Sequence, residues 1–402
     1  MFATLRLPVI LVIFLSLGPG VAAAEKKYDP GASDTEIKIG QTMPYSGPAS
    51  AYGTIGKSEV AYVKMINEQG GINGRKVNLM SLDDGYSPPR TVEQIRKLVE
   101  EEEVLFTFQT LGTPPNTAIQ KYMNAKKVPQ LFVATGATKW GDPEHFPWTM
   151  GWQPTYQHES RIYAKYLLQN KPDARIGILY QNDDYGKDYV KGFKDGLGDK
   201  ASRMIVAEVS YEVTDPSVDT QIVTLQGAGA DVFFNVTTPK FAAQAIRKSY
   251  DTGWRPLQFL NLVSNSIAAV IQPAGVEKAV GIVSAIYYKD PTDPAWRDDR
   301  ATKNYLAFMR KYYPDGNPED PLNVYGYNAA QTLMQVLKQC GDNLTRDNVM
   351  REAANLKELE VTMLLPSVRI NTSPTDFYPI EQVQLIRFDG KTWVRFGELM
   401  NR

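Results

Sequence analysis

Cysteine and histidine are scarce in this 402-residue chain, which holds one cysteine and two histidines. The single Cys340 excludes an intrachain disulfide, and no cysteine or histidine cluster has the spacing of a metal site. A chain of this length buries enough apolar surface to be stable without such cross-links. We therefore expect no metal and no cofactor, and we expect Cys340 to be a buried helix residue.

The chain also carries almost no net charge, with a formal value of −1 at pH 7. With a net charge this close to zero, the sequence has no excess of positive charge that would indicate binding to nucleic acid or to an anionic membrane surface. Hydrophobic residues make up 43% and charged residues 22%, which is typical of a soluble globular protein. The length exceeds that of one ordinary domain, so we expect two lobes of α/β type.

An apolar run at the N-terminus is too short to span a membrane, which takes about 20 residues. Arg6 precedes the run 7–17, Gly18-Pro19-Gly20 breaks it, and small residues follow at 21–24. This order predicts an export signal over residues 1–24, cleaved near Ala24, and a periplasmic protein. The alternative is an uncleaved N-terminal anchor. No cysteine stands at the cleavage site, so we expect no membrane anchor after cleavage.

Strands and helices alternate along the first third of the chain. Apolar periodicity predicts strands at 37–39, 76–82, 104–108 and 128–133, and helices at 58–68, 88–99 and 117–125. This order favours a parallel sheet covered by helices on both faces. Ligands bind such sheets outside the carboxyl ends of the strands. The polar strand ends at 46–53, 112–113 and 134–138 therefore share one rim.

The stretch Gly40–Gly56 is a crossing from a strand to a helix, rich in proline, serine and glycine. Free backbone N–H groups at a helix start can hold an anion. The alternative for this stretch alone is a turn that binds nothing.

The alternating pattern lapses between Trp140 and Tyr156 and then restarts. We place a lobe boundary in this segment, where Trp140, Trp148 and Trp152 pack the crossover, or where Trp152 alternatively faces a ligand. A second set of strands is predicted at 175–180, 205–209, 230–236, 257–262 and 279–287. Near the C-terminus, the alternating runs 382–388 and 392–396 around Asp389-Gly390 predict a β-hairpin.

Several of these segments carry recognisable motifs. They are Pro44-x-Ser46-Gly47-Pro48 with Tyr52-Gly53, then Asn67-Glu68-x-Gly70-Gly71-Ile72-x-Gly74-Arg75, then Asp83-Asp84, and 182–186 in the second half. The chain from about residue 36 to the C-terminus thereby resembles the leucine/isoleucine/valine-binding proteins, which are type I periplasmic solute-binding proteins of ABC importers.

The resemblance implies two Rossmann-like lobes joined by three crossover segments, with a ligand clamped between them by hinge closure. The first lobe would take residues 36–150 and 279–378, and the second lobe 151–278 and 379–402. The implied partners are a small-molecule ligand and the membrane permease of an ABC transporter, and the protein would be a monomer.

The resemblance also implies which residues bind. The ligand carboxylate would be held by the turn Gly112-Thr113, assisted by Ala134, Thr135 and Gly136. Tyr52 would cover the ligand body. Tyr185 of the second lobe would close over it, and Tyr325 falls where another pocket aromatic lies.

Two positions depart from the family pattern. An aromatic residue expected near Thr237 is absent, and the loop around Val263, which in amino-acid binders supplies an acid for the ligand ammonium, has no Asp or Glu. Because an unpaired buried ammonium is costly, an α-amino acid is disfavoured. The expected ligand is a carboxylate with an apolar or aromatic body. The alternatives are a branched-chain amino acid or amide binder, and a periplasmic sensory receptor.

Catalysis is not expected, because no nucleophile elbow, phosphate-binding loop or zinc-protease motif occurs. The acidic pairs Asp83-Asp84 and Asp183-Asp184 raise acid–base chemistry as an alternative. We expect both pairs to form turns and helix caps.

Overall fold

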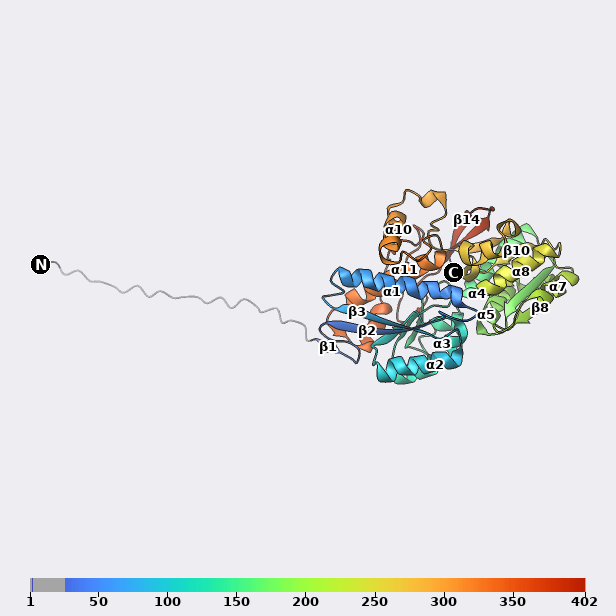
Figure 1. Ribbon diagram of the computed structural model, residues 1–402. Helices are drawn as coiled ribbons and strands as arrows, with labels where there is room; N and C mark the ends of the chain where they lie inside the picture. Colours follow the sequence, from blue (N-terminus) through green and yellow to red (C-terminus); the bar gives the residue numbers. More distant parts are fainter. Residues whose placement is uncertain (1, 3–25, 402) are drawn as a thin grey trace.

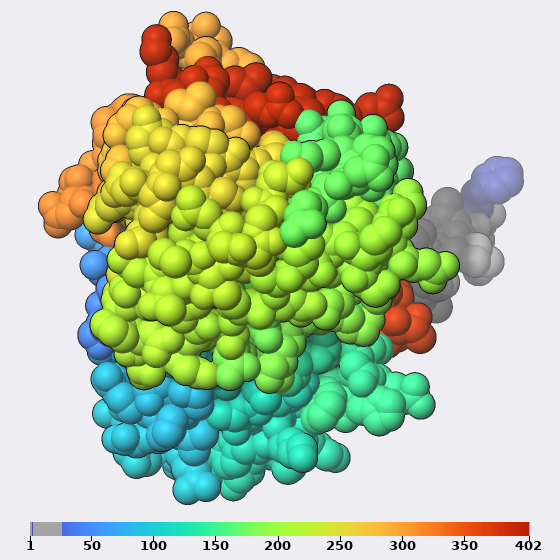
Figure 2. All heavy atoms as spheres, turned by 90° about the vertical axis from the view of Figure 1, so that its right-hand side faces the viewer, coloured from blue at the N-terminus to red at the C-terminus, as the bar shows by residue number. Residues whose placement is uncertain are grey.

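The computed structural model describes residue 2 and residues 26–401. The export signal predicted over residues 1–24 therefore lies outside the described residues, apart from residue 2. The described chain forms two α/β lobes, each built on one sheet, and they lie side by side in Figure 1. Figure 2 looks onto the second lobe, drawn in green and yellow, with the first lobe in cyan below it.

The sheet of the first lobe is parallel throughout, in the order β3-β2-β4-β5-β6. Its strands are β2 (Glu36–Met43), β3 (Lys76–Asp83), β4 (Phe106–Phe108), β5 (Gln130–Val133) and β6 (Thr149–Gly151). Its helices are α1 (Gly53–Glu68), α2 (Pro88–Arg96), α3 (Thr113–Lys126), α10 (Arg300–Tyr312), α11 (Pro321–Cys340) and α12 (Arg346–Ala353). In Figure 1, α1 and α11 lie on one side of this sheet and α2 and α3 on the other.

The sheet of the second lobe has the order β14-β13-β11-β10-β9-β7-β8. Five of its strands are parallel: β7 (Ile176–Gln181), β8 (Ile205–Tyr211), β9 (Val232–Val236), β10 (Leu257–Leu260) and β11 (Val283–Ile286). The longer helices of this lobe are α4 (Tyr156–Asn170), α5 (Asp184–Leu197), α7 (Asp219–Gly227) and α8 (Pro239–Asp251), and α6 (Ala201–Met204) and α9 (Gln272–Ala274) are short.

The predicted C-terminal hairpin is present as β13 (Gln382–Phe388) and β14 (Trp393–Asn401), which pair antiparallel. Its turn is set by the Asp389 carboxylate, which accepts the backbone N–H groups of Lys391 and Thr392. Gly390 has φ +101°, a value that suits glycine. The hairpin pairs with β11 and so extends the second sheet.

The pairing of β11 bears on where the lobes divide. The expected boundary assigned residues 279–378 to the first lobe, but β11 lies between β10 and β13 in the second sheet. Strand hydrogen bonding is a stronger guide to lobe membership than position in the chain. We therefore propose that the chain returns to the first lobe after Ile286.

The motif block around Gly71 and Arg75 has a structural role. Asn67 at the end of α1 bonds both the N–H and the C=O of Val77 at the start of β3. Gly71 has φ +78°, and a Cβ there would lie 1.9 Å from the Arg75 carbonyl oxygen. The buried Arg75 guanidinium donates to Asp342, just beyond α11, at 2.5 Å. The block therefore joins α1 and β3 to the end of α11.

The crossing within Gly40–Gly56 is shorter than the sequence suggested. Strand β2 continues to Met43, and α1 begins at Gly53 rather than at Ser58. Only residues 44–52 connect them, ending in a 3₁₀ turn at Ser50–Tyr52. Tyr52 is therefore held rigidly at the start of a sixteen-residue helix.

Helix α11 is buried along most of its length, and its last residue, Cys340, is a buried free thiol as predicted. Gly326 allows α11 to approach α1, since a Cβ at Gly326 would lie 2.6 Å from the Ile55 carbonyl oxygen. None of the helices in the described part of the chain has the length and apolar content of a membrane span.

Candidate functional site

A cavity lies where the carboxyl ends of the strands of both lobes meet. The first lobe, including helix α11, forms one wall of the cavity, and the second lobe forms the other. The segments that join the lobes also contribute residues. The lining residues are Tyr52, Ile55, Tyr86, Leu111, Gly112, Thr113, Ala134, Gln153, Tyr156, Tyr185, Thr238, Leu262, Val263, Asn265, Ser266, Tyr287, Tyr288, Pro321, Leu322 and Tyr325.

The structure brings most of the sequence-predicted site residues to this cavity. Those in its lining are Tyr52, Gly112, Thr113, Ala134, Tyr185, Val263 and Tyr325. Thr135, Gly136 and Thr237 are not in the lining. A Cβ at Gly136 would lie 2.5 Å from the Pro154 carbonyl oxygen, so Gly136 packs against the crossover. The Thr237 hydroxyl donates to Asn235, and the next residue, Thr238, lines the cavity instead.

Thr135 lies behind Thr113 and orients its hydroxyl. The Thr135 Oγ1 atom accepts from Ala137 N, Trp140 Nε1 and Tyr156 OH, each at 3.3 Å. These donors occupy its lone pairs, so its own proton goes to Thr113 Oγ1, at 2.6 Å. The Thr113 hydroxyl then has its proton free to donate into the cavity.

The start of α3 offers fewer backbone donors than an ordinary helix N-terminus. Pro114 and Pro115 follow Thr113 in the first turn and carry no N–H. Thr113 is therefore the only one of the first three helical residues that can donate from its backbone. Its N–H and hydroxyl are the two groups of this turn that could donate to an anionic group.

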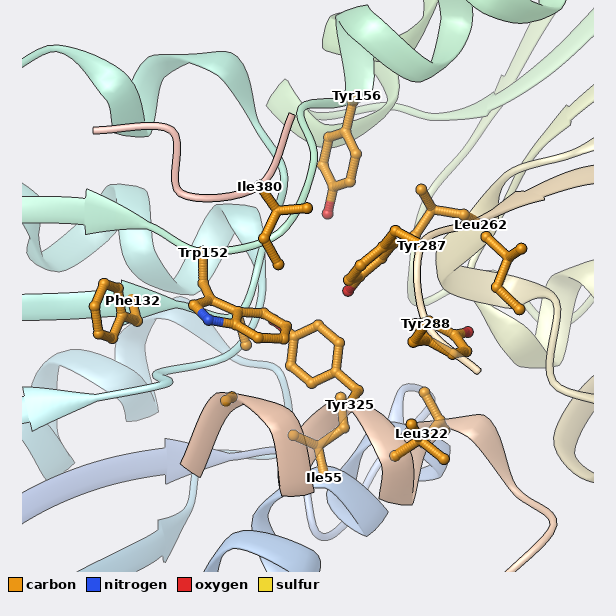
Figure 3. Packing of buried hydrophobic residues seen from close by; sticks show 14 of the residues in the cluster. Ile55, Phe132, Trp152, Tyr156, Leu262, Tyr287, Tyr288, Leu322, Tyr325 and Ile380 are labelled. Carbon is orange, nitrogen blue, oxygen red and sulfur yellow. The ribbon is translucent and has the colours of Figure 1, made fainter. Parts of the chain in front are cut away.

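Seven tyrosines dominate the cavity wall: Tyr52, Tyr86, Tyr156, Tyr185, Tyr287, Tyr288 and Tyr325. None of them is more than 7% exposed. Tyr156 and Tyr185, from different helices, meet edge to face with ring centroids 5.4 Å apart. Figure 3 shows Tyr156 at the start of α4, Tyr287 and Tyr288 after β11, and Tyr325 of α11 converging on one space, next to Ile55 and Leu322. Burial raises the pKa of each of these hydroxyls, so all seven are neutral phenols.

The cavity lining contains no Asp, Glu, Lys, Arg or His. The loop after β10 presents Leu262, Val263, Asn265 and Ser266 where an acid was expected in amino-acid binders. An ammonium group placed here would have no carboxylate to pair with. The lining can instead surround an apolar body and donate hydrogen bonds to an oxygen.

Glu159 is the buried carboxyl behind this loop. Its oxygens accept from Tyr163 OH at 2.7 Å, Tyr189 OH at 2.6 Å and Leu262 N at 2.7 Å. Burial raises the pKa of Glu159 to about 7, and these three donors oppose the rise. The carboxyl is therefore used to fix Leu262 in the cavity wall, and it does not line the cavity itself.

The acidic pairs form turns, as expected. Asp84 accepts the backbone N–H of Tyr86 and the hydroxyl of Thr91. Asp183 caps α5 by accepting the N–H groups of Tyr185 and Gly186. These contacts place Tyr86 and Tyr185 at the cavity. No cluster of three or more possible metal ligands occurs among residues 26–401.

Trp152 packs beside the cavity and is absent from its lining. Its ring lies 4.9 Å from that of Tyr325, edge to face, and its Nε1 donates to Thr332 at 3.1 Å. Trp140 is also buried, and Trp148 packs against the core. Of the two interpretations that the sequence left open for Trp152, the structure supports packing of the crossover.

Sequence reasoning missed Gln153, Tyr156, Tyr287 and Tyr288. The first two follow β6 in the segment without periodicity, and the last two directly follow β11. Tyr86 was also missed, although it directly follows the turn Asp83-Asp84-Gly85 at the end of the predicted strand 76–82. A search for aromatic residues at every strand end would have found Tyr86, Tyr287 and Tyr288.

The comparisons with known proteins agree with this architecture. A family model described as periplasmic binding protein matches residues 36–392. Leu/Ile/Val-binding protein homolog 1 of Brucella abortus (strain 2308) is 26% identical over 338 residues, which cover 82% of this chain and 85% of the relative.

Two solved structures share the fold. One is a branched-chain amino acid ABC transporter protein from Thermus thermophilus with bound valine, with a TM-score of 0.81 and 16% identity, covering 92% of this chain and 97% of that one. The other is a fatty acid ABC transporter substrate-binding protein from Thermomonospora curvata, with a TM-score of 0.78 and 20% identity, covering 94% and 95%. At these identities the likeness shows the fold alone.

Proposed function

This chain belongs to the type I periplasmic binding proteins of the leucine/isoleucine/valine-binding family, and on that premise we propose that it captures a small carboxylate with an apolar or aromatic body. The family consists of periplasmic ligand binders that are associated with ABC transporters, so the chain is a binding protein and not an enzyme. The observation that carries the proposal is an uncharged, tyrosine-lined cavity with the Thr113 donors at one edge.

The names of two structural neighbours support the carboxylate. The Thermus protein holds valine, and the Thermomonospora protein is named for fatty acids. These ligands share a carboxylate and an apolar body, and only valine has an ammonium group. A cavity lining without an acid suits a carboxylate and an apolar body, which both ligands have. It disfavours an ammonium group, which only valine has.

The ligand enters by opening of the lobes in this proposal. The tyrosines of both walls are almost fully buried in the conformation described, so separation of the lobes would expose them to an entering ligand. A ligand that bridges both walls stabilises the closed state by its differential affinity for it. Small-angle scattering should therefore show a larger radius of gyration without ligand than with it. An unchanged radius would contradict hinge closure.

Calorimetry with a panel of ligands tests the ligand class. The panel is benzoate, phenylacetate, hexanoate, benzamide and leucine. We expect one or more of the three simple acids to bind more tightly than leucine and benzamide. Tight binding of leucine with no binding of the simple acids would overturn the proposal and favour the branched-chain amino acid alternative.

Uptake by cells distinguishes transport from sensing. We propose that the protein delivers its ligand to the permease of an ABC importer, as a monomer. Deletion of its gene should then abolish high-affinity uptake of the radiolabelled acid that calorimetry identifies. Unchanged uptake with a lost transcriptional response to the acid would instead identify a sensory receptor. N-terminal sequencing of the exported protein should begin at Glu25 if the signal is cleaved after Ala24.

A further inference from the structure

Three polar atoms in the cavity wall have no hydrogen-bond partner among the described residues. They are Nε2 of Gln153 and the hydroxyls of Tyr287 and Tyr325. All three residues line the cavity, and they are 5%, 0% and 7% exposed. A buried donor without a partner costs free energy, and the great majority of such groups in folded proteins are paired. These three atoms are therefore exceptions that call for an explanation.

Other polar groups of the wall are paired within the protein. The Tyr185 hydroxyl accepts from Asn261, and the Tyr288 hydroxyl donates to Asn265 at 3.4 Å. The Tyr325 hydroxyl is unpaired, but it has the Gln109 side chain beside it. Gln153 and Tyr287 are the two unpaired lining residues of the described chain without such a neighbour, and they are the ones considered for a ligand.

The two residues lie on different segments that join the lobes. Gln153 lies two residues beyond β6, where the chain first leaves the first lobe, and Tyr287 directly follows β11, near the second crossing. Figure 3 shows the Tyr287 ring directed from its own segment toward Tyr325 and Trp152, with the hydroxyl at its leading end. Trp152 and Tyr287 meet edge to face with ring centroids 6.2 Å apart. The hydroxyl therefore points toward Trp152, the residue that precedes Gln153 in the chain.

The alternative is that both side chains serve only as packing. Phenylalanine would fill the place of Tyr287 equally well in that case, and it would avoid the cost of an unpaired hydroxyl. Leucine would do the same for Gln153. Neither substitution would then alter which ligand is preferred.

We propose that Gln153 and Tyr287 form a polar subsite on the crossover side of the cavity that takes an oxygen of the ligand. The ligand would then be an acid with a second oxygen function, a hydroxyl or a carbonyl, on its apolar body. This inference rests on the proposed function, because the carboxylate is assigned to Thr113. A glutamine amide and a phenol can each donate or accept, so the subsite pairs with either kind of oxygen.

Matched pairs of acids that differ only by one oxygen test the subsite. Benzoate is compared with 3- and 4-hydroxybenzoate, and phenylacetate with 4-hydroxyphenylacetate, by calorimetry. The wild type should prefer a hydroxylated acid by 10-fold or more. Tyr287→Phe and Gln153→Leu should each reduce that preference by about 10-fold, and leave the affinity for the parent acid within 2-fold.

Tyr288→Phe is the matched control, because its hydroxyl already has a partner in Asn265. It should change the affinities for both acids of a pair by the same factor. Thermal melting adds a readout without ligand: Tyr287→Phe should melt at the wild-type temperature or above, because it removes an unpaired group. A clear drop in melting temperature would show that the hydroxyl pairs within the protein, and would overturn the subsite.

The outcomes separate the two proposals. If the parent and hydroxylated acids bind equally well to the wild type, or if Tyr287→Phe weakens both alike, the subsite is wrong and the proposed function stands. If no acid of either kind binds, the proposed function is wrong and the subsite falls with it.

Discussion

The hydroxyl oxygens of Thr113 and Thr135 lie 2.6 Å apart, one at the start of α3 and the other just beyond β5. Thr135 does not line the cavity, yet it determines where the Thr113 proton points. Two turns at neighbouring strand ends thus act as one unit. A residue can contribute to binding in this way without contact with the ligand.

Replacement of Thr113 by valine should weaken binding of the preferred acid. Valine keeps the shape and removes the hydroxyl, so about 1–3 kcal/mol of binding free energy should be lost. Calorimetry measures the change. Thr117→Val is a matched control one turn further along α3, where the hydroxyl bonds the Thr113 carbonyl and Lys139. If Thr113→Val binds as the wild type does, Thr113 is not a ligand donor.

Replacement of Asp188 by alanine should loosen the closed state without touching the ligand. Asp188 on α5 accepts the N–H and hydroxyl of Thr138, each at 2.9 Å, and so joins the second lobe to the first. If the open state lacks this contact, its loss should lower ligand affinity by about 1–2 kcal/mol.

Asp195→Asn is the control for that change, because Asp195 lies on the same helix and pairs only with exposed Lys191 and Arg161. Its affinity should match that of the wild type. Equal affinities for Asp188→Ala and Asp195→Asn would show that the Thr138 contact does not contribute to closure.

Glu159 should make the stability of the protein depend on pH. Burial raises its pKa from an ordinary 4.5 to about 7, so between these values the folded state holds a proton that the unfolded state has released. Stability from this group is therefore present at low pH and is lost as pH rises toward 7, by roughly 3 kcal/mol in total. Glu159→Gln removes the titration.

Chemical denaturation of both proteins from pH 4.5 to pH 8 measures this effect. The unfolding free energy of the wild type, minus that of Glu159→Gln, should fall through that range and level off above pH 7. A difference that stays constant would mean that Glu159 titrates at its ordinary value.

Replacement of Gly326 by alanine should destabilise the first lobe. The added Cβ would lie 2.6 Å from the Ile55 carbonyl oxygen, and a helix backbone cannot yield as a flexible side chain does. We expect a loss of about 1–3 kcal/mol in unfolding free energy. Gly227→Ala at the exposed end of α7, where nothing lies within 4 Å, should be neutral or slightly stabilising. Equal effects of the two substitutions would contradict this account of the α1–α11 contact.

The sequence predicted the regular elements well because their apolar periodicity is set by burial on the faces of a sheet. Strand β3 was expected at 76–82 and is Lys76–Asp83, and the C-terminal hairpin lies where Asp389-Gly390 indicated. The start of α1 was placed five residues late, because Gly53 and Gly56 were assigned to the turn. Both glycines pack closely within the helix, against Tyr45.

The candidate site was harder to predict where it lies on irregular segments. Gln153 lies in the irregular segment between β6 and α4, and Tyr156 is the first residue of α4. An irregular segment has no apolar period that would indicate which side chains face a cavity. Thr135 was expected to bind directly, since nothing in the sequence shows that Ala137 and Trp140 occupy its hydroxyl. Only the three-dimensional arrangement separates a residue that meets the ligand from one that orients its neighbour.

Both lobes are completed by elements from the last part of the chain, and this order affects folding. The core of the first lobe needs α11, which begins at residue 321, and the second sheet is extended by β13 and β14 at residues 382–401. Contacts between such distant residues form late, because the loops between them must close first. A growing chain therefore cannot complete either lobe before its synthesis is nearly finished. Until α11 and the C-terminal hairpin have been made, neither lobe has its full set of packing partners, so stable folding comes after most of the chain has been synthesised.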